Sequence, residues 1–594
     1  MTEYTAPLGD LTFVINELAG LEELSKLPAF EHATDDLLGP ILDEASRFAR
    51  EVISPTNIVG DQEGCRIEDG VVRVPAEFSE AYRLFVEGGW QGLDCSPDYG
   101  GMGLPSLIGS AASEMWQGAN LALGLCPMLT GGAIETVATH ATDDLKQMYL
   151  PKMISGEWAG TMDLTEPQAG SDLAAIKAQA VPDGDHYRIT GTKIFITWGD
   201  HEMSENILHL VLARLSDAPE GVRGISLFLV PKFLVNDDGS LGDRNDVYAT
   251  SVEHKLGIHA CPTCVLNFGD NDGAVAYLVG QENRGLACMF TMMNLARLQV
   301  GVQGLAMSER AYQAARDYAK ERVQGQVPGS RENARIIQHP DVRRMLMTMK
   351  SLIEAMRATA LVSAATIDLA NNIEDPDIRT QALERAAVLT PIVKGWMTEV
   401  AQELTSIGVQ IHGGNGYIEE TGVAQHMRDA RILTIYEGTT GIQANDLVGR
   451  KVLADTGLGM QRLLQEIAEL DARLESCGTE LQSVRDAVAT GHQRLDEATN
   501  WLLEKGQDDP AVVYSAAFDY LMLAGTVIGA WQMGRAAEIA HRELVEKDGD
   551  ADFYKAKIIT AKFYAEQILP RSAAYFDAAT SGNSLAMDLP EDQF

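Results

Sequence analysis

The spacing of apolar and polar positions divides the chain into stretches of different period. In residues 1–160 apolar residues recur at steps of three and four, as in DDLLGPILDEASRFAREVI from Asp35 to Ile53, which is typical of amphipathic helices. A glycine-rich turn, YGGMGLP, separates helical patterns from Tyr99 to Pro105. We therefore predict a helical N-terminal domain over residues 1–160.

The period changes to two over residues 161–281. Short runs rich in β-branched and aromatic residues, such as HYRITGTKIFITWG and GISLFLVPKF, are bounded by Gly, Asp and Pro, which predicts β-strands. No helix-length segment separates these runs, so we expect a small sheet domain with largely antiparallel pairing.

Long helical patterns return from residue 282. We predict three long helices there, the third ending at the glycines of HGGNG, and they cover residues 286–323, 341–372 and 389–410. Residues 282–454 are interpreted as a helical bundle. Residues 455–594 are again helical in pattern and contain no glycine-rich motif, which indicates a separate C-terminal helical extension.

The predicted fold class is therefore mainly α with a central β domain. No GxGxxG follows a strand and no P-loop occurs, so a doubly wound nucleotide fold is excluded. The net charge of −38 excludes a general nucleic-acid surface, because phosphate binding needs clustered Lys and Arg.

The cysteines and the apolar runs both bear on whether the protein is cytoplasmic, secreted or membrane-spanning. The seven cysteines are odd in number and sparsely spaced, which is typical of a reducing cytosol. The start MTEYTAPLGDLTF lacks the features of a signal peptide. The most apolar run, Leu521–Trp531, is about half the ~20 residues that a membrane span needs, which favours a buried helix. We expect a cytoplasmic protein without a membrane span.

Two segments of the β domain carry candidate cofactor chemistry. TEPQAGSD, Thr165 to Asp172, offers hydroxyls and small residues that suit the polar edge of a flat cofactor, although an ordinary turn has the same composition. In KIFIT, Phe195 and Thr197 share one face by period two, so they suit stacking on a ring and hydrogen bonding to it. A plain strand facing the core is the alternative.

CPTC, Cys261 to Cys264, has the spacing of a redox or zinc pair. No second CxxC and no spaced His pair completes four ligands, and His254 and His259 give no zinc-finger spacing. The pattern favours two thiols in the core or a turn, and we expect no metal site.

The helical bundle contains three further candidates. QIHGGNGY, Gln410 to Tyr417, allows either a close backbone approach to a phosphate or ring or a simple helix C-cap. Arg297 lies on a largely apolar helix, where it is either buried with a partner or at the surface. Glu437, in RILTIYEGTTGIQ, is either a general base with a raised pKa in an apolar cleft or a surface acid at a helix start.

Six motifs taken together resemble the acyl-CoA dehydrogenase family. They occur in the family's order over roughly residues 90–450, and they are YGGMG, LTEPQAGSD, GTKIFITWG, NLARLQVGVQG, QIHGGNGY and MRDARILTIYEGTTGIQ. The resemblance implies a helical domain, a β domain and a four-helix domain. The N-terminal segment and the extension after about residue 455 resemble a longer bacterial subgroup of the family.

The resemblance also implies roles. Glu437 matches the base that removes the α-proton of an acyl-CoA thioester, while the β-hydrogen leaves as hydride to FAD and a trans-2-enoyl-CoA forms. Arg297 and Ser171 match residues that contact the CoA portion. The implied FAD contacts, some of them to the FAD of a neighbouring subunit and so implying a homodimer, are Thr165, Ser171, Phe195, Thr197, Arg322, Gln410, Gly413, Gly414, Thr439 and Gly441.

The sequence departs from the family pattern at a few positions. Ala296 stands where some relatives carry the base, so Glu437 has no rival. Phe195 stands where Trp is common, and Trp198 where Asn is common. After Arg322 the usual Phe-Gly is missing, which changes the expected intersubunit contact.

Three functions are compatible with these residues. The first is a dehydrogenase that acts on a fatty or thioether acyl-CoA and passes electrons to an electron-transfer flavoprotein. The second is an oxidase on the same scaffold, and the third is a non-catalytic acyl-CoA-binding protein. The intact Glu437 and flavin motifs argue against the third.

Overall fold

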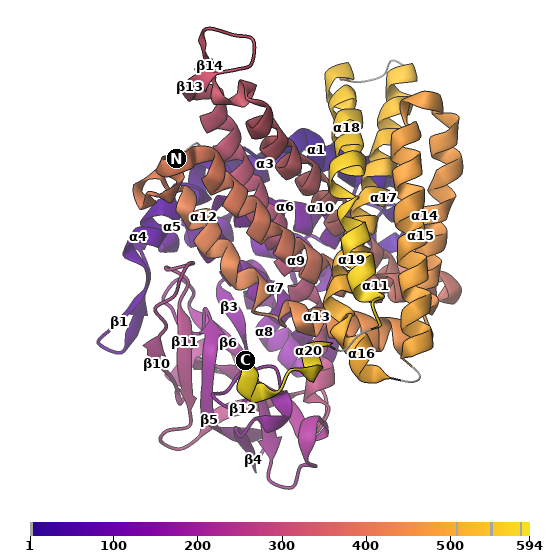
Figure 1. Ribbon diagram of the computed structural model, residues 1–594. Coiled ribbons are helices and arrows are strands. Elements are labelled where there is room, and N and C mark those ends of the chain that lie inside the picture. The colour runs from indigo at the N-terminus through magenta and orange to yellow at the C-terminus, as the bar shows by residue number, and fades with distance from the viewer. Residues whose placement is uncertain (1–3, 507–508, 547–549, 583–584) are drawn as a thin grey trace. The chain divides into compact units, whose positions relative to one another are not determined.

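The computed structural model describes residues 4–506, 509–546, 550–582 and 585–594 (Figure 1). The chain forms two compact units. Unit 1 comprises Met1–Asp43, Pro105–Glu114 and Val300–Phe594, and unit 2 comprises Glu44–Leu104 and Met115–Gln299.

Unit 2 contains an eight-stranded sheet. Its strands are β3 (Trp158–Asp163), β4 (Gln179–Asp183), β5 (His186–Thr197), β6 (Asn206–Leu215), β7 (Ile225–Pro231), β10 (Val247–Val252), β11 (Thr263–Phe268) and β12 (Ala274–Val279). The order is β10-β11-β5-β12-β7-β6-β3, and β4 pairs with both β5 and β6, which closes part of the sheet into a ring. Only β3–β6 and β4–β6 pair in parallel, so the predicted small, largely antiparallel β domain is confirmed.

Unit 2 also contains several helices. They include α4 (Thr56–Glu63), α5 (Ala76–Glu87), α7 (Leu121–His140) and α8 (Asp143–Ser155). Helix α7 packs on β3 so closely that a Cβ added at Gly160 would lie 2.6 Å from the Cβ of Ala133. By length and composition α7 is also apolar enough to cross a membrane, but 72% of its apolar window is buried in the protein. A buried core helix gives the same pattern.

The N-terminal part of the chain is not wholly helical. Strands β1 (Arg66–Glu68) and β2 (Val71–Arg73) pair in a hairpin. Asp69 and Gly70 between them both have positive φ, 51° and 79°. Asp-Gly is a favoured pair for such a two-residue turn, and the helical periodicity around it concealed that signal.

Three long helices follow the sheet domain, and they lie in unit 1 except for the first part of the first helix, up to Gln299, which belongs to unit 2. They are α9 (Gly285–Glu321), α10 (Pro340–Asn372) and α11 (Pro376–His412), which confirms that the three predicted helices exist. The third begins 13 residues before the predicted start at Leu389, because residues 376–383 are almost all exposed and carry little apolar periodicity. The side chain of Asp375 caps α11 by accepting from the N–H groups of Asp377 and Ile378. Gly413, at φ 60°, ends the helix as the sequence predicted.

Shorter elements complete this bundle. A hairpin of β13 (Val323–Gln326) and β14 (Asn333–Arg335) follows α9, and Figure 1 shows it projecting beyond the end of that helix. Two short helices near the predicted base are α12 (Val423–Ala430) and α13 (Thr440–Asp446). The remaining short elements are α1 (Leu8–Phe13), α2 (Leu21–Leu24), α3 (Asp35–Phe48), α6 (Ser106–Ala119), β8 (Phe233–Val235) and β9 (Leu241–Arg244).

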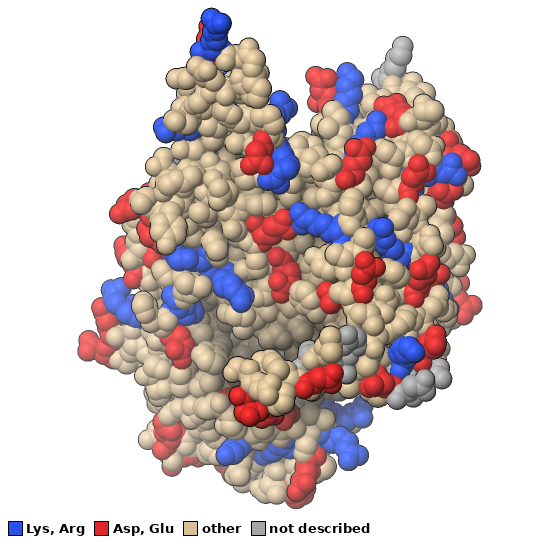
Figure 2. Space-filling model, in the orientation of Figure 1, with Lys and Arg blue, Asp and Glu red and all other residues tan. Residues whose placement is uncertain are grey.

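The extension is helical and belongs to unit 1. Its helices are α14 (Leu458–Ser476), α15 (Gln482–Lys505), α16 (Pro510–Ser515), α17 (Ala517–Glu546), α18 (Ala551–Phe563), α19 (Arg571–Ala579) and α20 (Leu585–Asp588). The apolar run Leu521–Trp531 is buried in α17, as predicted, and it packs against α11. On the face drawn in Figure 2, acidic and basic side chains are interspersed over the described part of the extension.

A buried ion network joins helix α1, which we call the N-terminal arm, to α10. The Arg357 guanidinium, whose side chain is 2% exposed, contacts Glu114 at 2.6 Å and Glu309 at 2.9 Å, and it also pairs with Asp10 of α1. These acids surround one cation on several sides, which offsets the cost of burying it.

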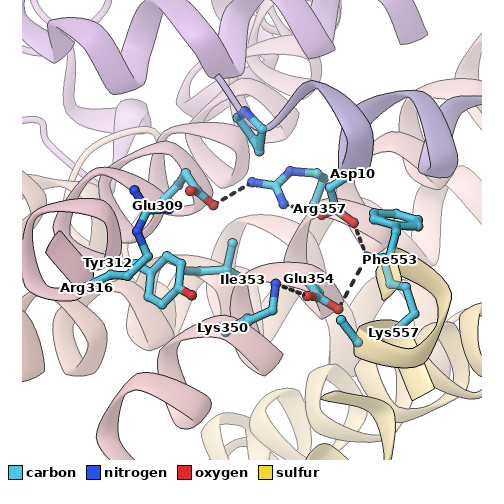
Figure 3. A pocket seen from close by; sticks show the side chains of 12 residues that line it. Asp10, Glu309, Tyr312, Arg316, Lys350, Ile353, Glu354, Arg357, Phe553 and Lys557 are labelled. Carbon is cyan, nitrogen blue, oxygen red and sulfur yellow. Dashed lines mark hydrogen bonds and ion pairs between the residues drawn. The ribbon is translucent and has the colours of Figure 1, made fainter. Parts of the chain in front are cut away.

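The same network continues into the extension. Lys557 of α18 pairs with Asp10 and lies 3.3 Å from Glu354 of α10. Thr560 donates to Glu354 at 2.7 Å. Figure 3 shows Asp10 and Lys557 converging with Glu354 at a polar cavity of about 160 Å³. The arm, the bundle and the extension are therefore held together by one set of charges.

Candidate active site

Phe195 lies in a β-bulge near the end of β5. Cys264 pairs with Ile196 and Leu266 with Lys193, so two residues of β5 face one residue of β11 between them. Phe195 has φ 60° and its side chain is 58% exposed. The alternative that this aromatic ring packs into the core is therefore excluded.

The residues after Phe195 alternate across the strand. Ile196 is buried at 2% exposure, whereas Phe195 before it is exposed and Thr197 after it is half-buried. The Thr197 carbonyl accepts from the Thr161 hydroxyl at 2.7 Å. Trp198, which also has positive φ, donates its indole N–H to the carbonyl of Ala122 at 3.1 Å and fixes the end of the strand.

The segment Thr165–Asp172 lies beside this bulge. The Thr165 carbonyl accepts from the N–H of Ile194, the residue before Phe195, at 2.9 Å. Ser171 is exposed in the same loop, and the Asp172 carboxylate accepts from the N–H of Ala174 at 3.0 Å. The structure thus brings Thr165 together with the Phe195–Thr197 end of β5.

Arg297 is buried on α9, with 4% of its surface exposed. The alternative of a surface position on an amphipathic helix is therefore excluded. Arg297 is therefore a buried cation, and Arg is rarely buried unless it is paired.

Glu437 has a strained backbone. It is half-buried at φ 57°, and Gly438 after it has φ 89°. A non-glycine residue in this left-handed region costs on the order of 1–3 kcal/mol and persists only where its surroundings fix it. The structure supplies two buried donors that do so.

These donors are Gln443 of α13 and Lys394 of α11, both with 0% exposure. Gln443 Nε2 donates to the Glu437 carbonyl at 3.1 Å and to the Gly438 carbonyl at 3.3 Å. Lys394 Nζ donates to the Gly438 carbonyl at 2.6 Å. No role was predicted for either residue from the sequence. Gln443 is the last residue of the motif that contains Glu437, and Lys394 lies mid-helix, 44 positions from its partner.

Thr439 and Gly441 lie two and four positions after Glu437. The Thr439 hydroxyl accepts from the N–H of Ile442 and caps α13. Thr440 donates to Glu399 at 2.5 Å, and the Tyr436 hydroxyl donates to Gln303 of α9. The start of α13 is thereby tied to both α9 and α11.

A second group of predicted residues lies at the ends of α9 and α11. The His412 ring stacks on Tyr318 with centroids 4.4 Å apart, which brings Arg322 and the Gly413–Gly414 turn to the same end of the bundle. Gln410, Gly413, Gly414 and Arg322 are exposed. A Cβ added at Gly413 or Gly414 would meet nothing within 4 Å, so their surface is open.

Cys261 and Cys264 are both buried with 0% exposure, and both are free thiols. Burial raises the pKa of Cys264 well above its ordinary value, which makes it a poor metal ligand and nucleophile. Over the described residues, no group of three or more His, Cys, Asp or Glu is placed to hold a metal ion.

Family models match nearly the whole chain. The acyl-CoA dehydrogenase N-terminal, middle and C-terminal domain models match residues 40–157, 161–271 and 283–453. A model described as acetyl-CoA dehydrogenase C-terminal like matches residues 462–590. The chain belongs to the acyl-CoA dehydrogenase family.

Individual relatives of this acyl-CoA dehydrogenase match over its full length. It is 47% identical to the 3-methylmercaptopropionyl-CoA dehydrogenase of Ruegeria pomeroyi, over 98% of this chain and 99% of the relative. It is 35% identical to a butyryl-CoA dehydrogenase of Syntrophomonas wolfei, over 100% and 99% of the two chains. The crystal structure of an acyl-CoA dehydrogenase complexed with FAD from Bacillus anthracis superposes with a TM-score of 0.74 at 19% identity, covering 99% and 93% of the two chains.

These matches confirm the predicted fold class, the acyl-CoA dehydrogenase activity and FAD as the cofactor. One observation, the surroundings of Phe195, shows that the residues present fit FAD. Phe195 presents an aromatic ring at 58% exposure, Thr197 lies two residues further along β5, and Thr165 is bonded through its carbonyl to the residue before Phe195. A flat ring with polar edges needs such a stacking surface with hydroxyl groups near it.

Proposed function

We propose that this acyl-CoA dehydrogenase oxidises 3-methylmercaptopropionyl-CoA, a short thioether acyl-CoA, to the corresponding trans-2-enoyl-CoA. The support is the 47% identity to the Ruegeria pomeroyi enzyme of that name over 98% of the chain. The butyryl-CoA dehydrogenase at 35% identity also carries the name of a short-chain activity.

Glu437 is proposed as the base that takes the α-proton. An α-C–H beside a thioester is a weak acid, so the carboxylate must be held in the direction of attack. The left-handed backbone of Glu437, with its own carbonyl held by Gln443 and the Gly438 carbonyl held by Gln443 and Lys394, gives the side chain that fixed direction. Bound FAD supplies the acceptor for the β-hydrogen, which leaves as hydride.

Other residues are assigned to binding. Arg297 and Ser171 are proposed to contact the CoA portion. The proposed FAD contacts on the same subunit are Thr165, Ser171, Phe195, Thr197, Thr439 and Gly441. Arg322, Gln410, Gly413 and Gly414 are proposed to contact the FAD of a second subunit, which implies a homodimer, and their open surface supports this.

Electrons are proposed to pass to an electron-transfer flavoprotein in the cytoplasm. Transfer to oxygen is the competing outcome. Anaerobic turnover with a dye acceptor, compared with peroxide formation in air, separates the two. We expect turnover with the dye and little peroxide. Peroxide formed at the rate of substrate loss would overturn this assignment.

The substrate proposal is tested by kcat/KM across acyl-CoAs from short straight chains through the thioether acyl-CoA to long chains. We expect the thioether acyl-CoA to have the highest value, with butyryl-CoA as the matched control because it lacks the sulfur. A higher value for butyryl-CoA or for a long chain would overturn the thioether assignment.

A further inference from the structure

An ion pair lies in the core of the β domain directly behind the proposed FAD contacts. Lys193 of β5 has 0% of its side chain exposed and Glu166 has 3%, and Nζ lies 2.8 Å from Oε1. Glu166 follows Thr165 in sequence, and Lys193 precedes Phe195 by two residues. Removing one partner of such a pair leaves an uncompensated buried charge, so each residue depends on the other to remain buried.

The Glu166 carboxylate accepts hydrogen bonds from three residues of the segment that follows it. It accepts from the N–H of Lys177 at 2.6 Å, from the N–H of Ala178 at 3.0 Å and from Gln168 Nε2 at 2.7 Å. Burial alone would raise the pKa of Glu166, but Lys193 and these backbone donors outweigh it and hold the pKa below its ordinary value. The carboxylate is therefore ionised at neutral pH.

Lys193 connects this loop to the strand. Its ammonium also donates to the Leu164 carbonyl at 3.1 Å, on the other side of Thr165 from Glu166. Thr165 is thus flanked on both sides by contacts to one buried cation. Its own carbonyl accepts from the N–H of Ile194, which is the next residue after Lys193.

The bulge is the part of the strand that most needs such support. Phe195 has φ 60°, a conformation that persists for a non-glycine residue only where neighbouring contacts over-determine it. The Ile194 N–H bond holds the first of the two bulged residues, and the Lys193 side chain anchors the residue immediately before the bulge.

We propose that Glu166 and Lys193 are positioning residues for the FAD site, which hold Thr165 and the bulge at Phe195 in the one arrangement that binds the flavin. This rests on the proposed assignment of Thr165, Phe195 and Thr197 as FAD contacts. The pair acts through these residues and touches no reacting atom itself.

The test compares FAD retention and the visible spectrum of the holoenzyme in Glu166→Gln and Lys193→Met. FAD release is measured on dilution, and folding by circular dichroism and thermal denaturation. We expect the FAD dissociation constant to rise on the order of tenfold or more, because small displacements of positioning groups have effects of that size. The flavin absorption bands should also shift.

Lys232→Met is the matched control. Lys232 is another buried lysine of the same domain, 2.6 Å from Asp200, and it donates to the His201 carbonyl. We expect it to lower thermal stability while the FAD constant and spectrum stay unchanged. An equal loss of FAD in Lys232→Met and Lys193→Met would show a general stability effect and overturn the proposal.

Thr197→Val distinguishes a failure of the proposed FAD contacts from a failure of the positioning role of Glu166 and Lys193. If Thr197→Val leaves FAD affinity and spectrum as in the wild type, the proposed FAD contacts fail. If it changes them while Glu166→Gln and Lys193→Met do not, only the positioning role is overturned. Should Lys193→Met not fold, Glu166→Gln decides alone, because it keeps the shape and one acceptor oxygen.

Discussion

Gly525 of α17 lies directly against Trp396 of α11. A Cβ at position 525 would come within 2.2 Å of the Trp396 Cγ, so no side chain fits between the two helices. Gly529, one turn along, lies as closely against the hydroxyl of Tyr564. The extension is thereby packed on the bundle at a distance that only glycine permits.

Gly525→Ala should lower stability by about 1–3 kcal/mol, the usual cost of overpacking a core. Denaturant unfolding measures this. Gly39→Ala is the control, because a Cβ there meets nothing within 4 Å and alanine favours the helix. Equal stability of Gly525→Ala and the wild type would contradict the close packing.

Glu437→Gln should keep bound FAD and lose turnover by several orders of magnitude. General-base catalysis alone contributes ~10²–10⁴, and so weak a carbon acid requires more. Flavin absorbance and kcat are the two measurements. A variant that kept more than a tenth of wild-type kcat would remove Glu437 from the role of base.

Lys394→Met should lower kcat while substrate KM and FAD content change little. The lost charge-assisted bond to the Gly438 carbonyl is worth about 1.5–3 kcal/mol, and its loss frees the left-handed turn at Glu437. Thr398→Val, one turn along α11, is the control, because the Thr398 hydroxyl only bonds its own helix. The idea fails if both variants lower kcat alike.

Arg297→Ala should raise the Kd for acyl-CoA, since a charge-assisted contact is worth about 1.5–3 kcal/mol. FAD content should hardly change. Titration with a substrate analogue and flavin absorbance give the two values. Loss of FAD with normal acyl-CoA binding would assign Arg297 to the other ligand.

Asp10→Asn should destabilise the protein by about 3 kcal/mol at neutral pH, the usual cost of breaking a buried ion pair. Burial would raise the pKa of Asp10, but Lys557 and Arg357 outweigh it and lower the pKa well below its ordinary value. A depressed pKa contributes stability above the unfolded pKa of about 3.9, and that stability is lost as pH falls further.

The difference in unfolding free energy between wild type and Asp10→Asn should therefore shrink as the pH falls below about 4. Denaturant unfolding at several pH values measures it. A difference that stays constant down to pH 3 would show that the Asp10 charge is not what stabilises the network.

The sequence predicted the long helices well because their signals are local. The Gly413 stop of the third helix was predicted, but that helix begins at Pro376, 13 residues before the predicted start at Leu389, and the Asp375 cap that marks its start was missed. The hairpin at Asp69–Gly70 was missed although its turn signal is local, because the surrounding pattern is helical. Local signals therefore predicted the correct element only where the periodicity and the cap or turn residues indicated the same structure.

The candidate site was predictable to a lesser degree. The order of the motifs pointed to Glu437, Phe195 and Thr197, but the bulge that exposes Phe195 depends on pairing with β11, about seventy residues away. Lys193 and Glu166 meet across 27 positions, and Lys394 meets Gly438 across 44. Neither contact leaves a periodic signal in the sequence.

The pairing of Asp10 with Lys557 has a consequence for how the chain is made. The two residues are 547 positions apart, so at ordinary translation rates the carboxylate waits about half a minute to two minutes for its ammonium partner. Until α18 leaves the ribosome, the charged residues of the arm and of α10 lack their ion pair with Lys557. The buried network can therefore close only on a chain whose C-terminal helices have been synthesised, and a prematurely terminated product is left with an incomplete core.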